Sequence, residues 1–241
     1  MASAVEQSEQ ELREKKRVLA ALVVHDLRSP LTGISGCLEL VKAELGADPA
    51  NQHLLAYLDD AELLVRKTLG LVATILDVDE LEDGILRAHL TPVRVRELVE
   101  RAHAGNRAQF EVRDMGFEID CDPTLVAALD RDLVGRVLEN LIDNGARYAS
   151  RRGRCAVQVL RVDDCIEIAV GNSGPPVPLA EREAIFGRFY QVQARRAAAR
   201  ANRGLGLYFC KLAAEAHGGT IHVESRGDLG AVFVVRIPQA A

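Results

Sequence analysis

The chain has 241 residues, of which 48% are hydrophobic and 27% charged, so it is long enough and apolar enough for one or two packed domains. A net charge of −5 and a pI near 5.7 exclude an overall basic surface of the kind that binds nucleic acid or an anionic membrane. The polar start MASAVEQSEQELREKK is not a signal peptide, and no apolar run approaches the ~18 residues that span a bilayer. We therefore expect a soluble, cytoplasmic chain that contacts neither nucleic acid nor membrane.

The cysteines are spaced far apart and form no C-x-x-C pair. An odd number of cysteines without metal-ligand spacing predicts free thiols in a reducing compartment. We expect each one to act as a small buried hydrophobic residue: Cys37, Cys121, Cys155, Cys165 and Cys210.

Residues 1–82 contain no strand pattern and predict two helices joined by the turn sequence GADPAN at residues 46–51. Apolar or small residues recur in steps of four and three, which indicates a heptad seam on each helix. The first seam is Ala20, Val24, Leu27, Leu31, Ile34, Leu38, Val41 and Leu45. The second is Leu54, Leu58, Ala61, Val65, Thr68, Val72 and Ile75, widened by Tyr57, Leu64, Leu71 and Val78. Because these faces are wider than one partner helix covers, we expect two hairpins to pair as a homodimeric four-helix bundle.

The stretch HDLRSPL places His25 one position off the first seam, so that it turns toward solvent. Asp26 can orient the imidazole or accept its proton, and Ser29 keeps the same side polar. Pro30 cannot donate to the carbonyl of Asp26, yet the seam continues in register beyond it, so we expect a kink within one helix. An inert surface histidine is the alternative that this pattern alone leaves open.

From about residue 92 short β-type runs alternate with helical segments, after a linker at residues 83–91. Strands are predicted at 117–120, 155–160, 165–170, 220–225 and 231–237, and helices at 93–109, 130–149 and 205–218. We expect residues 92–241 to form an α/β sandwich with one mixed sheet and helices on one face. The sequence SRGDLGA at 225–231 is the expected hairpin turn. The overall fold class is α+β with two domains.

Two asparagines and an arginine follow one helical face in LENLIDNGARYA, at Asn140, Asn144 and Arg147. Amide oxygens suit a hard cation and a guanidinium suits phosphate, although a solvated polar face has the same composition. HDLRSPL resembles the H-box of sensor histidine kinases, and LENLIDNGARYA resembles their N-box. The resemblance implies that Asn144 binds Mg²⁺ and that Asn140, Arg147 and Tyr148 contact phosphates or frame the site.

Three further stretches resemble boxes of the same family, in the same order. VGNSGPPVP resembles the G1 box, with Asn172 in place of the aspartate that accepts from the adenine amine and Pro176 in place of a glycine. IFGRFYQ resembles the F-box, with Phe186 and Phe189 as anchors of a lid. NRGLGL resembles the G2 box, with Asn202 at a glycine position. The resemblance implies nucleotide contacts for Asn172, Gly174, Arg203, Gly204, Leu205, Gly206 and Leu207.

The resemblance spans residues 17–238 and implies a Bergerat (GHKL-type) ATP-binding domain behind a phospho-accepting hairpin. It implies an ATP-dependent protein histidine kinase that uses ATP and Mg²⁺, phosphorylates His25 with help from Asp26, and passes the phosphoryl group to a response-regulator receiver domain. Ser29 stands where the family positions a hydrolytic water. Two alternatives stay open: a dimeric phosphotransfer or scaffold protein with a degenerate ATP-binding domain, and an ATPase of the same superfamily that acts as a conformational clamp.

Overall fold

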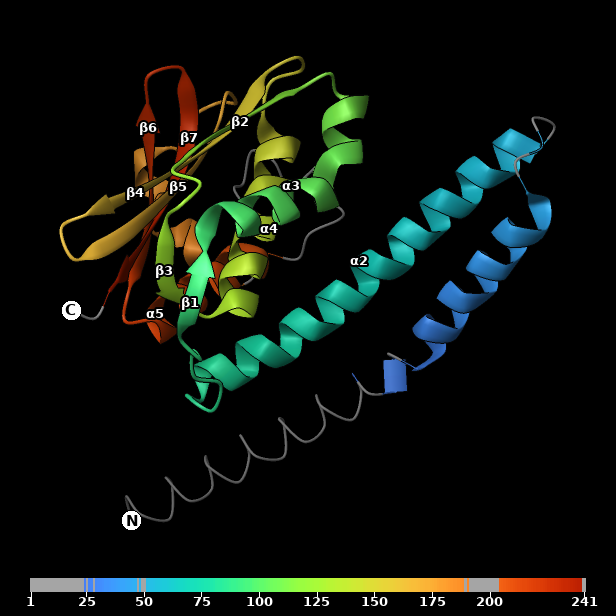
Figure 1. Cartoon of the computed structure of the whole chain (residues 1–241), viewed down its shortest axis with the longest axis horizontal. Helices are drawn as coiled ribbons and strands as arrows, with labels where there is room; N and C mark the ends of the chain where they lie inside the picture. The colour runs from blue at the N-terminus through green and yellow to red at the C-terminus, as the bar shows by residue number, and fades with distance from the viewer. Residues whose placement is uncertain are drawn as a thin grey trace, which may run out of the picture. The chain divides into compact units, whose positions relative to one another are not determined.

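Figure 1 shows the computed structural model of the chain, which describes residues 24, 26–27, 29–46, 48, 51–188, 190 and 204–239. The chain divides into two compact units, Met1–Glu80 and Leu81–Ala241. Within the described ranges, no helix combines the length and the apolar character needed to cross a membrane.

The first unit is a helical hairpin, as the sequence predicts. Residues 29–45 are helical, and α2 (Gln52–Glu82) follows after a short turn. Gly46 ends the first helix with a φ of +58°, a left-handed conformation that glycine adopts readily, and the Asn51 amide donates to the carbonyl of Leu45 at 3.0 Å. The Lys42 ammonium reaches Asp59 of α2 at 2.7 Å, so the two helices lie side by side (Figure 1).

Pro30 lies in a helical part of the chain. Residues 26 and 27 are helical, and so are Ser29, Pro30 and Leu31. Helical residues are thus described on both sides of the proline, and a single helix running through it stays a prediction, because Arg28 lies outside the described residues. The kink itself stays a prediction.

Apolar side chains of the hairpin are left at its surface in a heptad pattern. Leu27, Ile34 and Val41 recur every seven residues and are 44%, 49% and 45% exposed. Tyr57 and Leu64 on α2, also seven residues apart, are 70% and 65% exposed. A contiguous apolar face of this kind is typical of an interaction surface.

The second unit contains two sheets. β1 (Thr91–Arg94) and β3 (Val126–Leu129) form an antiparallel pair. The larger sheet has the order β2-β4-β5-β7-β6, in which only the β2–β4 pair is parallel, so the predicted mixed sheet is confirmed. Its strands are β2 (Gly116–Cys121), β4 (Arg154–Val162), β5 (Cys165–Asn172), β6 (Thr220–Arg226) and β7 (Leu229–Pro238).

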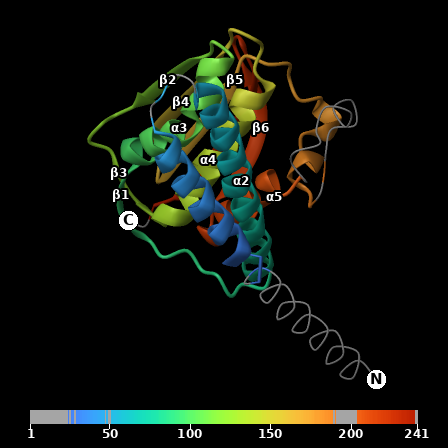
Figure 2. The same ribbon diagram turned by 90° about the vertical axis from the view of Figure 1, so that its right-hand side faces the viewer.

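Three helices cover one face of the larger sheet (Figure 2). They are α3 (Val95–Val112), α4 (Arg131–Tyr148) and α5 (Gly206–Ala216), and two short 3-10 turns, η2 (Leu179–Glu181) and η3 (Ala184–Phe186), precede α5. α4 packs on β4 and β5, and α5 packs on β6 and β7. Alternate residues of β5 point into this layer, and Ile166, Ile168 and Val170 are almost completely buried there.

The expected helix at 93–109 is wrong at its start. Val93 and Arg94 belong to β1, and the helix begins at Val95 and continues to Val112. The reason is strand pairing, because Val93 is opposite Ala127 of β3 and is buried. Residues 91–94 therefore follow the two-residue side-chain alternation of a strand, and the helical repeat begins only after them.

The expectation of buried cysteines holds for three of them and is wrong for Cys37, which is exposed on the first helix. Cys121, Cys155 and Cys210 are buried, and Cys165 is half-buried. Burial raises the pKa of the Cys155 thiol from 9.0 to about 12, and it also raises the pKa of Cys210. A folded-state pKa above the unfolded value stabilises the fold below pH 9.0, and this contribution is lost as the pH rises toward about 12.

Thiol labelling at neutral pH is therefore expected to separate these cysteines. Iodoacetamide should modify Cys37 at the rate of a free thiol, whereas Cys155 and Cys210 should react only after unfolding, because the thiolate is the reactive form and burial suppresses it. Mass spectrometry of the labelled peptides gives the site and the rate. In the Cys37→Ser variant the fast phase should vanish, and rapid labelling of Cys155 in the native protein would contradict the structure.

Candidate active site

Helix α4 carries the polar residues of the predicted N-box. Its N-terminus is capped by Asp130, whose carboxylate accepts from the backbone N–H of Asp132 and of Leu133 at 3.0 and 2.9 Å. One face of the helix is packed in the core, and Asn140 and Asn144 lie at the edge of that face, both half-buried. The predicted pair of amides therefore lies along one partly accessible edge.

Asn140 brings the N-box against the G2 segment. Its Nδ2 donates to the carbonyl of Arg136 at 2.9 Å, and a methyl group built on Gly206 would lie 2.7 Å from its Oδ1. A side chain at Gly206, the first residue of α5, would therefore force the Asn140 amide to shift. The preceding Leu205 makes no side-chain cap, so the first backbone N–H groups of α5 keep the capacity to bind an anion.

Two glycines and two leucines form the described part of the G2 segment. Gly204 has a φ of +71°, which explains why the resemblance places a glycine there. Leu205 is buried, and Leu207 is half-buried on α5. Arg203, also predicted to contact nucleotide, lies outside the described residues, as does Asn202.

The C-terminal end of α4 meets the G1 segment. A methyl group on Gly174 would lie 2.0 Å from the carbonyl oxygen of Tyr148 and 2.6 Å from Nδ2 of Asn172. Asn172 is the last residue of β5 and is 2% exposed. Among the described residues, its Nδ2 has no hydrogen-bond partner. Residues 140, 148, 172, 174 and 206 thus form one connected arrangement around α4.

Arg147 is paired within its own helix rather than left open toward the site. Its guanidinium contacts the Asp143 carboxylate at 2.9 Å, and the Gln109 amide donates to the other oxygen of that carboxylate at 3.0 Å. Tyr148 beside it is half-buried. To contact a phosphate as predicted, the Arg147 guanidinium would therefore have to leave the Asp143 carboxylate or to contact both groups at once.

The residues predicted to support phosphoryl acceptance lie in the first unit. Asp26 and Ser29 are exposed helical residues, whereas His25 lies outside the described residues. Of the two predicted lid anchors, Phe186 is buried and lies edge-on to Phe233 with 6.3 Å between ring centroids. Phe189 lies outside the described residues.

Arg113 is a supporting residue that the motifs do not reveal. It follows α3, and its guanidinium donates to the carbonyl oxygens of Ala146, Arg147 and Ala149, the last two at 2.7 and 2.9 Å. These are carbonyls that the end of α4 leaves without partners. A cation there also opposes the negative end of the helix dipole. Arg113 therefore holds the helix end that meets Gly174.

Replacing Arg113 by alanine is expected to lower the free energy of unfolding by about 2–3 kcal/mol, because three charge-assisted hydrogen bonds are lost. The melting temperature should fall by roughly 5–10 °C for a domain of this size, measured by circular dichroism on the full chain. The matched control is Arg107→Ala, since Arg107 makes an exposed ion pair with Glu111 and should melt like the wild type. Equal melting temperatures for the two variants would refute the capping role.

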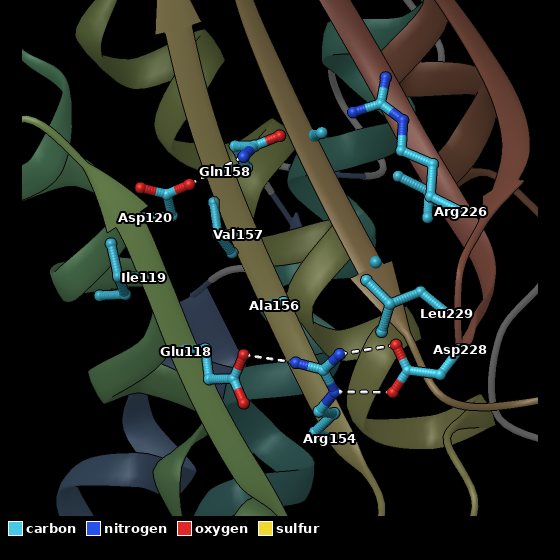
Figure 3. Close-up of a pocket in the computed structure, with 13 residues that line it drawn as sticks. Glu118, Ile119, Asp120, Arg154, Ala156, Val157, Gln158, Arg226, Asp228 and Leu229 are labelled. Atoms are coloured by element: carbon cyan, nitrogen blue, oxygen red, sulfur yellow. Dashed lines mark hydrogen bonds and ion pairs between the residues drawn. The ribbon is translucent and has the colours of Figure 1, made fainter.

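A cavity of about 460 Å³ lies on the open face of the larger sheet (Figure 3). Figure 3 shows Arg154 between the carboxylates of Glu118 and Asp228, and the Arg154–Asp228 pair is 2.6 Å long. Gln158 donates to Asp120 at 2.7 Å beside them. Three carboxylates and two guanidiniums line this cavity, Arg154 is paired with two of the carboxylates, and none of the predicted site residues takes part. We therefore place the candidate site at α4 and not here.

Two family models match the two parts of the chain. The His Kinase A (phospho-acceptor) domain matches residues 15–84. The family described as Histidine kinase-, DNA gyrase B-, and HSP90-like ATPase matches residues 129–241. The first contains the HDLRSPL segment, and the second contains the whole arrangement around α4.

Sequence and structure searches agree with these matches. The sensor protein SrrB of Staphylococcus aureus (strain N315) is 26% identical over 234 residues, which are 96% of this chain and 40% of SrrB. The full-length ShkA structure in complex with AMPPNP is 23% identical with a TM-score of 0.68, over 92% of this chain and 46% of ShkA. The histidine kinase ThkA, in complex with response regulator protein TrrA, is 24% identical with a TM-score of 0.57, over 98% of this chain and 66% of ThkA.

The chain spans about two fifths of the length of the SrrB proteins that it matches. Both family models, the SrrB proteins and the solved histidine kinases nevertheless point to one architecture. A phospho-acceptor hairpin precedes an ATPase domain with a mixed sheet, and the sequence boxes of both are in place. The chain belongs to the sensor histidine kinases and comprises their catalytic core.

Proposed function

We propose that this chain is an ATP-dependent protein histidine kinase that phosphorylates His25 and passes the phosphoryl group to an aspartate of a response regulator. The observation that carries the proposal is the arrangement around α4, where Asn140 lies against Gly206 and Tyr148 lies against Gly174. These contacts bring the N-box, G1 and G2 segments together, although up to 66 positions separate them in the sequence (residues 140 and 206). A resemblance in sequence alone would not require that meeting.

The residues at this arrangement fit a nucleotide. The buried, unpartnered amide of Asn172 suits a base, and the uncapped start of α5 suits phosphates. ATP supplies the phosphoryl group, and Mg²⁺ offsets its charge. We assign base contact to Asn172 and Gly174, and the remaining contacts to Asn140, Arg147, Tyr148, Arg203, Gly204, Leu205, Gly206 and Leu207.

Asn144 is the proposed ligand of Mg²⁺. Across the described residues, no group of three or more histidine, cysteine, aspartate or glutamate side chains could hold a metal ion. The cation would therefore depend on the amide oxygen of Asn144 together with phosphate oxygens, which suits a hard ion that prefers oxygen ligands.

His25 is the proposed phosphoryl acceptor. Its neutral imidazole is a nucleophile at physiological pH, and Asp26 accepts the proton from the other ring nitrogen or orients the ring. The rate then depends mainly on positioning and charge neutralisation, as in phosphoryl transfer generally. Ser29, with its exposed hydroxyl, is the residue that we assign to water positioning if the chain also dephosphorylates its partner.

The proposed partners are a second copy of the chain and a receiver domain. The exposed heptad stripe of Leu27, Ile34 and Val41 supports pairing of two hairpins into a four-helix bundle. The receiver domain would dock on the bundle near His25, and we propose that the chain acts in the cytoplasm together with this partner. ThkA, which shares the fold, was solved with such a regulator.

A dimeric phosphotransfer or scaffold protein is the second candidate. It is favoured by Asn172 and Pro176, which replace the aspartate and glycine that the G1 box resemblance leads one to expect. Isothermal titration calorimetry separates the two candidates, since a scaffold with a degenerate domain should show no heat of binding at millimolar ATP.

The deciding experiment is incubation of the full chain with γ-labelled ATP and Mg²⁺, followed by tests of the label. Phosphohistidine is expected, which is labile in acid and stable in base. A label that is stable in acid, or no label in a protein that binds ATP, would contradict the proposal.

A further inference from the structure

The amide of Asn172 stands out among the buried polar side chains of the second unit. Asn106 donates its Nδ2 to the Ala102 carbonyl at 3.0 Å, and both ring nitrogens of His217 have partners, the Asp130 N–H at 3.0 Å and the Ala213 carbonyl at 2.7 Å. Asn172 is more deeply buried than either, and its Nδ2 has no partner within the described part of the chain. A buried donor without an acceptor destabilises the fold, so its retention points to an acceptor atom on a ligand.

The surroundings of Asn172 hold its backbone firmly and bring a glycine against its amide. It pairs with Cys155 on one side and with Ala231 on the other, in the interior of the sheet. The two glycines closest to it, Gly145 and Gly174, put no side chain near it, and a methyl group at Gly174 would lie 2.6 Å from Nδ2. The Asn172 amide is therefore fixed in place through its backbone, and the backbone of Gly174 lies beside it.

An amide and a carboxylate read the edge of a purine differently. Adenine presents an amine donor next to a ring nitrogen acceptor, whereas inosine and guanine present a carbonyl acceptor next to a ring N–H donor. An amide carries one acceptor and one donor group, so it matches either edge after rotating by half a turn. A carboxylate only accepts, and it would face the purine carbonyl with no proton between the two oxygens.

We propose that Asn172 makes this site tolerant of the base, so that it binds triphosphates of purines that carry a carbonyl in place of the adenine amine, as well as ATP. This inference rests on the proposed function, because Asn172 reads a base only if the domain binds a nucleotide. It assigns to the unpartnered Nδ2 a specific acceptor, the carbonyl oxygen of inosine or guanine.

The test is calorimetry on the full chain with the Mg²⁺ salts of ATP, inosine triphosphate and GTP. The dissociation constants of ATP and inosine triphosphate are expected to lie within about tenfold of each other. In Asn172→Asp, inosine triphosphate should weaken by about 10- to 100-fold relative to ATP, because the carboxylate cannot donate to the carbonyl. Asn51→Asp, in the hairpin turn, is the matched control and should keep the wild-type ratio.

Each outcome bears on one claim. Wild-type protein that binds ATP and rejects inosine triphosphate by more than about 100-fold overturns the inference and leaves the proposed function standing. An Asn172→Asp variant that binds ATP, but whose ratio of inosine triphosphate to ATP dissociation constants equals that of the wild type, also overturns it. The wild-type ratio is measured on the unmodified protein, so that part of the test does not depend on the folding of a variant. Absence of binding by any of the three nucleotides at millimolar concentration overturns both claims. If inosine triphosphate binds and GTP does not, the carbonyl contact is supported, and the site does not accommodate the additional amine of guanine.

Discussion

Replacing His25 by glutamine is expected to abolish phosphorylation of the chain by ATP, with a loss of at least roughly 1,000-fold in the labelling rate. The glutamine amide has a similar length and polarity, but its nitrogen is not nucleophilic, so no phosphoryl group can be accepted there. The loss is measured as acid-labile label per chain after incubation with γ-labelled ATP. Calorimetry should show unchanged ATP affinity, because the nucleotide contacts that we propose all belong to the second unit.

The matched control for this variant is His53→Gln. His53 is an exposed histidine on α2 of the same hairpin, and its replacement should leave labelling unchanged. Label that persists in His25→Gln and disappears in His53→Gln would transfer the acceptor role to α2. Labelling of both variants at the wild-type rate would remove the hairpin from the reaction.

Replacing Asn144 by alanine is expected to weaken binding of Mg²⁺–ATP by about 10- to 100-fold and to reduce labelling of His25 to a similar or greater extent. The Asn144 amide oxygen is the metal ligand that we assign to α4. With alanine at this position, the cation would be bound only by phosphate oxygens and water. Alanine favours the helix, so the fold should be retained. Calorimetric titration of ATP in the presence of excess Mg²⁺ gives the affinity.

Metal removal identifies the cause of that effect. In EDTA the wild type should fall to the affinity of Asn144→Ala, and the variant should change little. Glu139→Ala, an exposed neighbour on α4, is the control and should respond to Mg²⁺ as the wild type does. If Asn144→Ala gained as much from Mg²⁺ as the wild type, the metal would be held elsewhere.

The elements with strong periodicity were predictable from the sequence. The apolar pattern places α4 at Arg131–Tyr148, within one residue of the expected 130–149 at each end, because its core face repeats over five turns. β4 extends its predicted run by three residues in total and β5 by two, and β4 alternates buried with half-buried residues along most of its length. In both cases a repeating burial pattern, and not local propensity, carries the information.

Short or tertiary features were not predictable in the same way. β1 and β3 have four residues each, and β3 reads VAAL, which has little preference for a strand. Nothing in the sequence indicates that Arg113 reaches the last turn of α4. The Asp143–Arg147 pair, by contrast, has the i, i+4 spacing of a helical ion pair and could have been predicted. Contacts between distant segments, such as Asn140 with Gly206, depend on packing that no local pattern encodes.

The strand order has a consequence for biosynthesis. β7 comes last in the order of the chain, yet it lies between β5 and β6 rather than at an edge. The sheet cannot close while a ribosome still holds residues 229–238, so the nucleotide-binding unit must wait for its final strand before it becomes functional. The helical hairpin consists of residues that leave the ribosome earlier, so it is free to form, and to meet a second copy, well before that moment.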